Sequence, residues 1–304
     1  MNNFIALRDF SAGEINALIE LALKIKKKPL DYQTVLEGKY VGLLFEKPSL
    51  RTKTAFYVGS LQLGAQAIYY APQEIKLGQR EEIRDAARTF SKYLDAVVLR
   101  TSSHAILEEF SKFSSKPVIN ALSDFLHPSQ AIADILTIRE LKKDIRKIKV
   151  AYAGDGNNVC NSLIYAFSIL GGNLSLAIPA RYKPREIVLR QAMAKSASSG
   201  ARIELAVSLK EAVCGADIIY TDVWTSMGKE AEYKIRKKYF KNFQINDTIL
   251  KLAKSDTAVM HCLPAHRGEE ITDSVIDGVN SVVFLQAENR LHAAKAILFS
   301  LLKK

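Results

Sequence analysis

The stretch YVGLLFEKPSLRTKT, residues 40–54, joins an apolar run to a segment with helical spacing. The apolar run predicts a buried strand over residues 40–45, and the apolar positions after Thr54 predict a helix that begins near Thr52. A strand, a tight turn and a helix in this order form the unit from which parallel sheets are built. We therefore expect an α/β fold that contains this unit.

The predicted helix start carries hydroxyl, guanidinium and ammonium groups, contributed by Ser49, Arg51, Thr52 and Lys53. The first backbone N–H groups of a helix have no partner within the helix, and the positive end of the helix dipole lies there. Such a helix start can bind a phosphate group. It can also be an ordinary helix start with Ser49 as the N-cap and solvated charges, and this stretch alone does not decide between the two.

The composition is typical of a soluble globular protein, with 304 residues of which 48% are hydrophobic and 25% charged. This length suggests two domains. No apolar run approaches the roughly 18 residues of a membrane span, and residues 1–10 lack the apolar core of a secretory signal. We therefore expect a cytoplasmic protein. The cysteines, Cys160, Cys214 and Cys262, are far apart, which disfavours a disulfide framework or a zinc ribbon.

The net charge of +11 indicates either nucleic acid or anionic small molecules as partners. The basic residues fall into short runs within residues 24–28, 142–149 and 236–241. The first run is typical of a helix end, where cations suit the dipole, and the other two fit a link between domains and the sides of an exposed helix. We interpret these runs as solvated faces, which favours anionic small molecules.

Predicted strands alternate with predicted helices along both halves of the chain, which favours parallel sheets. The expected strands are residues 40–45, 67–70, 96–99 and 117–120 in the first half, and 149–153, 174–178, 202–207, 217–220, 257–261 and 281–285 in the second. The fold class is thus α/β with two domains, each a parallel sheet flanked by helices, joined by interdomain helices. The expected domains are residues 1–140, completed by a C-terminal helix at 288–304, and residues 148–285.

Two polar features of the first half follow predicted strands, where open α/β sheets bind their ligands. Arg100 comes after four apolar residues, and His127 and Gln130 lie on the first turn of a predicted helix. They offer a cation for an anion and donors for a carbonyl oxygen and an amide-like group. Taken alone, Arg100 is equally consistent with a surface salt bridge, and His127 with a buried structural histidine. Their shared position at strand ends favours a ligand-binding site.

The turn at residues 154–158, Gly-Asp-Gly-Asn-Asn, only weakly resembles a dinucleotide-binding turn. Val159 stands where a third glycine is needed, and the next predicted strand is not followed by an acidic residue for a ribose. Arg181 could contact a 2′-phosphate, so the missing acidic residue does not by itself exclude a phosphorylated nicotinamide cofactor. The asparagines fit a hydrogen-bonded polar ligand better.

Two more loops follow apolar strands in the second half. Residues 222–228 combine a carboxylate, a hydroxyl and exposed backbone, which suits an amino-acid head group, although an ordinary loop around a buried Trp224 has the same pattern. His261, Cys262 and His266 are residues of the type that bind zinc, but no fourth ligand stands at a fitting spacing. Cys262 can also be a nucleophilic thiolate or simply a buried thiol.

The segments at residues 49–53, 127–130, 222–228 and 261–264, in this order and spacing, resemble the signature segments of the aspartate/ornithine carbamoyltransferase family. The last two, with residues 154–158, are more similar to the ornithine branch. The resemblance implies transfer of a carbamoyl group from carbamoyl phosphate to the δ-amine of L-ornithine, giving L-citrulline and phosphate. It implies no metal, no organic cofactor and no nucleic-acid or membrane partner. It also implies a homotrimer, or a higher oligomer built of trimers, with active sites shared between subunits.

The resemblance further implies roles for single residues, each carried over by position. Carbamoyl phosphate would be bound by Ser49, Leu50, Arg51, Thr52, Lys76, Arg100, His127, Gln130, Cys262, Leu263 and Arg290. Of these, Thr52, Arg100 and His127 would hold the carbonyl oxygen, and Gln130 and the Leu263 carbonyl the carbamoyl nitrogen. The catalytic residues would be Arg100, His127, Cys262 and Arg290. The α-amino and α-carboxylate groups of ornithine would be bound by Asn158, Asp222, Ser226 and Met227.

Three positions depart from the family pattern. Leu50 replaces a threonine, and Lys53 replaces an arginine, which is a more rigid donor. Lys76, in a loop that a neighbouring subunit would supply, stands where the family often has glutamine or histidine. Two alternative functions follow from the sequence: a carbamoyltransferase for another amine, such as putrescine or N-acetylornithine, and a basic nucleic-acid-binding protein without enzymatic activity.

Overall fold

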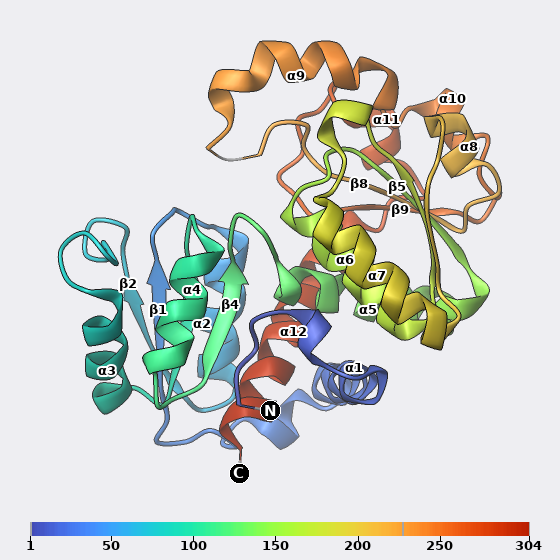
Figure 1. Ribbon diagram of the computed structural model, residues 1–304. Coiled ribbons are helices and arrows are strands. Elements are labelled where there is room, and N and C mark those ends of the chain that lie inside the picture. The colour runs from blue at the N-terminus through green and yellow to red at the C-terminus, as the bar shows by residue number, and fades with distance from the viewer. Residues whose placement is uncertain (1, 227, 304) are drawn as a thin grey trace. The chain divides into compact units, whose positions relative to one another are not determined.

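The computed structural model describes residues 2–226 and 228–303, and Figure 1 shows it as a ribbon. The chain divides into two compact units, Met1–Leu136 with Glu288–Lys304, and Thr137–Ala287. The domain limits expected from the sequence, residues 140 and 148, lie close to the first point of division.

The first unit contains a four-stranded parallel sheet in the order β2-β1-β3-β4. Its strands are β1 (Tyr40–Phe45), β2 (Gln66–Tyr70), β3 (Ala96–Arg100) and β4 (Val118–Leu122). All five residues of β3 are buried, as expected for an inner strand covered on both faces. The chain order reverses between β1 and β3, because β2 lies on one side of β1 and the later strands lie on the other. Ligands of open α/β sheets bind at such a switch point.

Among the described residues, six α-helices belong wholly or partly to the first unit. They are α1 (Ala12–Lys27), α2 (Arg51–Gln62), α3 (Ile83–Tyr93), α4 (His104–Phe113), α5 (Pro128–Lys142) and α12 (Val283–Leu302). Helices α3 and α4 cover one face of the sheet, where they pack in one apolar cluster with β1, β3 and β4 (Figure 1). Helices α5 and α12 run through the two points of division, so the expected interdomain helices are present.

The second unit contains a five-stranded parallel sheet in the order β7-β6-β5-β8-β9. Its strands are β5 (Lys149–Ala153), β6 (Asn173–Ala177), β7 (Arg202–Leu205), β8 (Ile218–Thr221) and β9 (Ala258–His261). Here the order reverses between β5 and β8. The loops that follow these two strands are those that begin at Gly154 and Asp222, so the polar loops singled out from the sequence lie at this switch point.

The helices of the second unit are α6 (Asn158–Leu170), α7 (Glu186–Ser199), α8 (Leu209–Val213), α9 (Tyr233–Phe240), α10 (Asp247–Leu250) and α11 (Asp273–Ile276). Helices α8, α10 and α11 pack in one apolar cluster with alternate residues of β5, β8 and β9. Short 3-10 helices complete the chain at Leu7–Asp9, Pro29–Tyr32, Ile145–Lys147, Ala180–Tyr182, Glu230–Glu232 and Lys241–Phe243. The α/β class and the two parallel sheets expected from the sequence are confirmed.

The strand expected at residues 281–285 is wrong. Ser281 forms only an isolated bridge with Val259, and α12 begins at Val283 instead of Glu288. A short apolar run cannot by itself distinguish a strand from a helix. Burial settles the case, because Val283 and Gln286 are buried while Phe284 is exposed, which is helical spacing.

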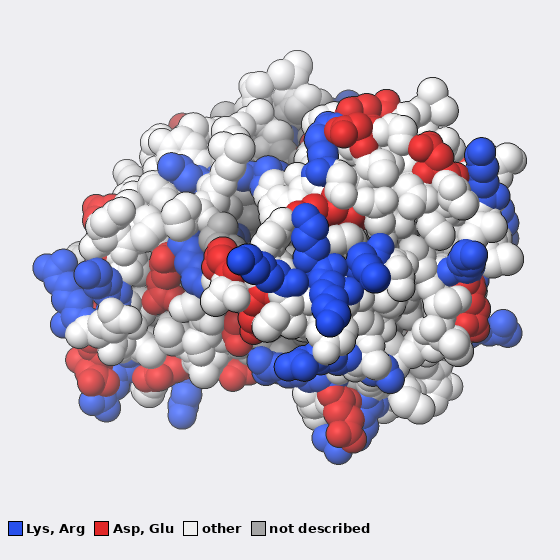
Figure 2. Space-filling model, turned by 90° about the horizontal axis from the view of Figure 1, so that it is seen from above, with Lys and Arg blue, Asp and Glu red and all other residues white. Residues whose placement is uncertain are grey.

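The surface is mixed in charge. Figure 2 shows lysine and arginine side chains in several groups on one face, with aspartate and glutamate side chains among them. None of the helices in residues 2–226 and 228–303 combines the length and the apolar character that crossing a membrane requires.

Candidate functional site

The turn between β1 and α2 lies at the switch point of the first sheet. Phe45 at the end of β1 pairs with Arg100 at the end of β3, and the Glu46 N–H donates to the Arg100 carbonyl at 2.9 Å. The sheet register therefore brings Arg100 beside the turn that leads into α2. Both the turn and Arg100 were expected at strand ends from the sequence.

The N-terminus of α2 has no side-chain cap. Leu50, and not Ser49, occupies the N-cap position, and no side chain accepts a hydrogen bond there. The alternative in which Ser49 caps an ordinary helix start is therefore wrong. The Leu50 side chain is 75% exposed, so it does not cover the helix end with protein. An uncapped helix start favours an anion as the partner of its N–H groups.

Three arginines of the first unit lie near one another. Arg100 is only 7% exposed, and its Nε has no hydrogen-bond partner in the described part of the chain. Burial, then the like charges of Arg290 and Arg51, lower the pKa of Arg100 to about 10. Buried cations that repel one another are costly unless an anion neutralises them. This cluster is therefore built for a negatively charged ligand.

Thr52 and Arg290 are in direct contact in this cluster. The Arg290 Nη2 donates to the Thr52 hydroxyl at 2.5 Å, which fixes a hydroxyl of the first turn of α2 against a buried guanidinium of α12. Arg290 is the eighth residue of α12, because the helix starts at Val283 and not at residue 288 as expected from the sequence.

His127 is buried immediately before α5. Burial, reinforced by the positive charges of Arg290 and Arg100, holds its pKa well below the usual value, so the ring is neutral at pH 7. Its Nδ1 lies 3.4 Å from the Ser129 hydroxyl. A neutral imidazole beside two arginines can donate a hydrogen bond to a polarised carbonyl oxygen without adding to their repulsion.

Gln130 presents an unsatisfied oxygen. Its Nε2 donates to the Asp134 carboxylate at 2.8 Å, which assigns the amide orientation. Its Oε1 is buried and has no hydrogen-bond partner among the described residues. A buried acceptor without a donor is costly, so the arrangement favours a ligand that carries an N–H group.

The first unit brings only some of the predicted residues together. Ser49 is half-buried in the turn, whereas Lys76 is exposed in the loop between β2 and α3. The Lys53 ammonium lies 3.8 Å from the centroid of the Tyr69 ring, so this departure from the family pattern has a cation–π partner.

The stability of the protein should fall as the pH is lowered from 7.5 to 5.5. The pKa of His127 is lower in the folded state, so the unfolded chain binds a proton near pH 6.5 that the folded chain does not. Stability is therefore full above that pH and is lost below it, by at most about 1.4 kcal/mol per pH unit for one histidine.

Urea unfolding of the wild type and of His127→Gln at both pH values measures this loss. The wild type should lose more stability than the variant. Burial also lowers the pKa values of His104 and His292, but these residues contribute equally to both proteins. Equal pH dependence of the two proteins would contradict a neutral, buried His127.

In the second unit the Asp222 carboxylate accepts hydrogen bonds from two side chains and from the Val223 backbone N–H, the last at 2.8 Å. Thr221 at the end of β8 pairs with Ala153 of β5 and with His261 of β9, so the residues that follow these strands are neighbours. The Asn157 amide donates to Asp222 at 2.7 Å, and the Cys262 thiol donates to the same carboxylate at 3.0 Å. A thiol that donates a proton is not a thiolate, which disfavours Cys262 as a nucleophile.

The other candidate site residues of the second unit are Asn158, Ser226, Met227 and Leu263. Asn158 is half-buried in the first turn of α6, and its side chain accepts from the Val159 N–H at 2.9 Å. Ser226 is half-buried in the loop after β8, and Met227 lies outside the described residues. Leu263 is half-buried and has a left-handed backbone, with a φ of 57°.

The turn at Gly156 does not suit a dinucleotide. Its N–H donates to the Tyr182 carbonyl at 2.9 Å, and a Cβ at this position would lie 2.4 Å from the Pro184 nitrogen. The space that a pyrophosphate would need is therefore filled by residues 182–184.

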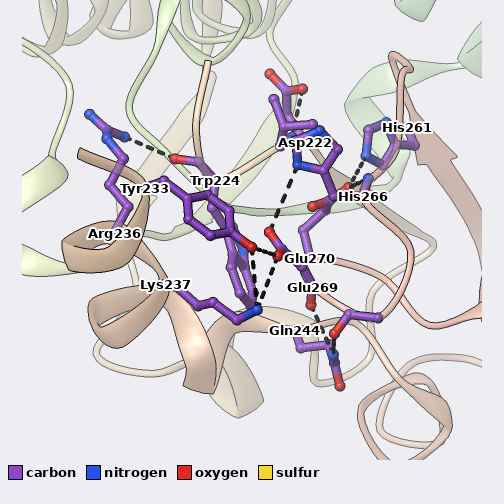
Figure 3. Close-up of polar contacts among 12 residues, drawn as sticks. Asp222, Trp224, Tyr233, Arg236, Lys237, Gln244, His261, His266, Glu269 and Glu270 are labelled. Carbon is purple, nitrogen blue, oxygen red and sulfur yellow. Dashed lines mark hydrogen bonds and ion pairs between the residues drawn. The ribbon is translucent and has the colours of Figure 1, made fainter. Parts of the chain in front are cut away.

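Sequence reasoning missed a buried ion pair behind the loop after β8. Arg236, counted as part of a solvated basic run, is only 2% exposed, so that interpretation is wrong for this residue. Its Nη1 donates to Asp155 at 2.8 Å and to the Trp224 carbonyl at 2.9 Å; Figure 3 shows the contact with Trp224. Burial raises the pKa of Asp155 in spite of this arginine. Nothing in the local sequence distinguishes Arg236 from its exposed neighbours.

Two groups of side chains in the described part of the chain have the composition of a metal site. Asp222, His261 and Cys262 form one, and His266, Glu269 and Glu270 form the other. In the first, Asp222 already accepts from the thiol. In the second, the Lys237 ammonium lies 3.2 Å from Glu269, which disfavours a further cation there.

Comparison with known proteins identifies both halves of the chain. The family model "Aspartate/ornithine carbamoyltransferase, carbamoyl-P binding domain" matches residues 2–140. The model "Aspartate/ornithine carbamoyltransferase, Asp/Orn binding domain" matches residues 146–301.

Similar proteins cover almost the whole chain. An ornithine carbamoyltransferase from Pyrococcus horikoshii is 48% identical over 302 residues, which are 99% of this chain and 95% of the relative. The solved ornithine carbamoyltransferase from Pyrococcus furiosus has a TM-score of 0.95 at 47% identity, covering 99% of this chain and 97% of that one. The anabolic ornithine carbamoyltransferase from Campylobacter jejuni has a TM-score of 0.94 at 38% identity, covering 99% of both chains.

Proposed function

Because the chain belongs to the aspartate/ornithine carbamoyltransferase family, we propose that it transfers the carbamoyl group of carbamoyl phosphate to the δ-amine of L-ornithine, giving L-citrulline and phosphate. The observation that carries this proposal is the arginine cluster at the uncapped N-terminus of α2. The choice of ornithine is supported by the names of the similar proteins, which are ornithine carbamoyltransferases.

The phosphate group would bind at the N-terminus of α2. In this proposal Ser49, the Leu50 N–H and Arg51 contact the phosphate oxygens, and Lys76 would be added by a neighbouring subunit. The positive helix end and the guanidinium groups stabilise the charge of the leaving phosphate. Binding an anion there also relieves the repulsion that lowers the pKa of Arg100.

The carbonyl oxygen of the carbamoyl group would face Thr52, Arg100 and His127. The neutral δ-amine attacks the carbonyl carbon, and the carbonyl oxygen becomes an oxyanion. The bond to phosphate then breaks as the carbonyl re-forms, and the leaving phosphate accepts the proton that the attacking nitrogen loses. Donors already fixed around the oxyanion lower the barrier, because they need no rearrangement during the reaction. Arg290 would support the same pocket through its contact with Thr52.

The carbamoyl nitrogen needs hydrogen-bond acceptors. Gln130 Oε1, which no described residue contacts as a hydrogen-bond donor, fits this role, and the Leu263 carbonyl would be the second acceptor. In the second unit, the ornithine α-amino and α-carboxylate groups would be bound by Asp222, Asn158, Ser226 and Met227. Cys262 would donate to Asp222 and complete the carbamoyl pocket without forming a covalent bond.

We also propose that the active enzyme is a trimer or is built of trimers, with Lys76 of one subunit completing the site of the next. The exposure of Lys76 supports this assignment, because the side chain is available to a neighbouring subunit. Measurement of the mass in solution tests the trimer, and a monomer with full activity would contradict it.

An amine panel tests the substrate. The protein should form a carbamoylated product from ornithine with a kcat/KM at least roughly 100-fold above that for putrescine or N-acetylornithine, because these amines lack either the α-carboxylate or the charged α-amino group. Product formation can be followed by mass spectrometry. A preference for putrescine or N-acetylornithine would mean that this amine, and not ornithine, is the substrate. Salt-dependent nucleic-acid binding without any carbamoylated product would mean that the protein is not a carbamoyltransferase but binds nucleic acid.

A further inference from the structure

His261, at the end of β9, makes a hydrogen bond that assigns its tautomer. The Leu263 N–H donates to His261 Nδ1 at 2.8 Å. A backbone N–H can only donate, so Nδ1 must be unprotonated and the ring proton lies on Nε2. The His261 backbone N–H is bonded separately, to the Gln286 side chain at 2.8 Å. Nδ1 of the ring is therefore the hydrogen-bond acceptor for the Leu263 N–H.

A buried carboxylate holds the other side of the ring. His261 Nε2 lies 3.1 Å from Glu270 Oε1, and both side chains are fully buried. The same carboxylate oxygen accepts from the His266 backbone N–H at 2.5 Å, and Figure 3 shows both contacts. Glu270 is thus fixed by the backbone and in turn fixes the plane of the imidazole, an arrangement that determines tautomer and orientation.

The backbone that His261 holds is in an uncommon conformation. Leu263 has a φ of 57°, a left-handed value that side-chain-bearing residues rarely adopt. Such a conformation is strained and persists only where the surroundings enforce it. The bond from the Leu263 N–H to His261 is one of the contacts that do so, because it fixes the peptide group that precedes Leu263 and so restrains the backbone that carries the Leu263 carbonyl.

We propose that His261, oriented by Glu270, is a positioning residue that aims the Leu263 carbonyl at the amino group of the carbamoyl donor. The inference rests on the proposed function, which gives this carbonyl to the carbamoyl nitrogen. His261 itself contacts no substrate in this scheme. Its contribution is selectivity for a donor that carries an amino group at the transferred carbon.

Two substitutions at His261 separate this role from simple filling of the core. Asn places an acceptor oxygen near the position of Nδ1, so His261→Asn keeps the bond from Leu263 and loses Glu270. Gln places its amide near Nε2, so His261→Gln keeps Glu270 and loses the bond from Leu263. His266→Gln is the matched control, because His266 is exposed and only its backbone contacts Glu270.

The measured quantity is the preference for carbamoyl phosphate over acetyl phosphate, in which a methyl group replaces the amino group. Dissociation constants of both, and of inorganic phosphate, are measured by calorimetry on the intact protein. His261→Gln should lower the preference by about tenfold, the usual effect of losing one hydrogen bond to a ligand. His261→Asn and His266→Gln should stay within about threefold of the wild type, and phosphate affinity should be similar in all four proteins.

A folded His261→Gln variant that keeps the wild-type preference would overturn the inference, as would an equal loss of affinity for all three ligands. Should that variant not fold, Glu270→Met carries the test. It removes the acceptor that holds the plane and tautomer of the imidazole, so the ring is free to turn away from the Leu263 N–H, whereas the short Asn side chain of His261→Asn needs no such partner. The same loss of preference is expected, and an unchanged preference overturns the inference. A wild type that forms no citrulline would refute the proposed function, whereas an unchanged preference in an active enzyme refutes only the role of His261.

Discussion

Arg100→Met should lower kcat for citrulline formation by on the order of 1,000-fold, the upper range for loss of one donor to a transition-state oxyanion. Arg100 ends β3 beside the turn into α2, and its Nε has no hydrogen-bond partner among residues 2–226 and 228–303. Loss of a hydrogen bond from this nitrogen to the fold therefore does not explain such an effect. Steady-state kinetics with saturating ornithine measure the effect.

The same substitution should leave the protein as stable as the wild type, or more stable. Burial and the charges of Arg290 and Arg51 disfavour the charged form of Arg100, as its lowered pKa of about 10 indicates. Removing one of three mutually repelling cations relieves the other two, and Met fills much of the same apolar volume. Loss of activity together with a lower midpoint of urea unfolding would indicate a structural role instead.

The control for this experiment is Arg202→Met. Arg202 is an exposed arginine of β7 in the second unit, and the substitution should change neither kcat nor stability appreciably. A large effect of Arg202→Met would mean that general charge, and not the arginine cluster, governs the rate.

Asp222→Asn should lower kcat/KM for ornithine by on the order of 100-fold, as expected for loss of a charge-assisted hydrogen bond to an α-amino group. The neutral amide also has only one acceptor oxygen, whereas Asp222 accepts from both Asn157 and Cys262. One of these two donors is left unsatisfied, so the loop after β8 loses part of its support.

Binding of carbamoyl phosphate to Asp222→Asn should stay within about threefold of the wild type. The arginine cluster and Gln130 belong to the other unit and are chemically unchanged by the substitution. Calorimetry with carbamoyl phosphate and kinetics with varied ornithine separate the two effects. A variant with normal KM and kcat for ornithine would contradict the assignment of Asp222.

The alternation of apolar runs and helical segments was enough to predict the two parallel sheets, because strand ends in such sheets coincide with polar, Pro- and Gly-containing turns. It failed at residues 281–285, where a short apolar run belongs to α12. Only the periodic burial of Val283 and Gln286, a tertiary property, distinguishes the two possibilities.

The positions of Arg100 and Asp222 at the carboxyl ends of apolar strands were predictable, because each polar residue ends a local apolar run. The candidate site was not predictable where a side chain acts through a distant partner. Asp155 and Arg236 are 81 positions apart, and no local pattern relates them. The same holds for the unsatisfied oxygen of Gln130, which becomes visible only when its amide is seen bonded to Asp134.

The central claim is that the arginine cluster and the Asp222 loop act on two substrates of one transfer reaction. The most direct test measures phosphate release and citrulline formation in the same sample, with and without ornithine. The account predicts that phosphate release depends on ornithine and that one citrulline appears for each phosphate. Phosphate release at the same rate without ornithine, or without citrulline, would contradict it.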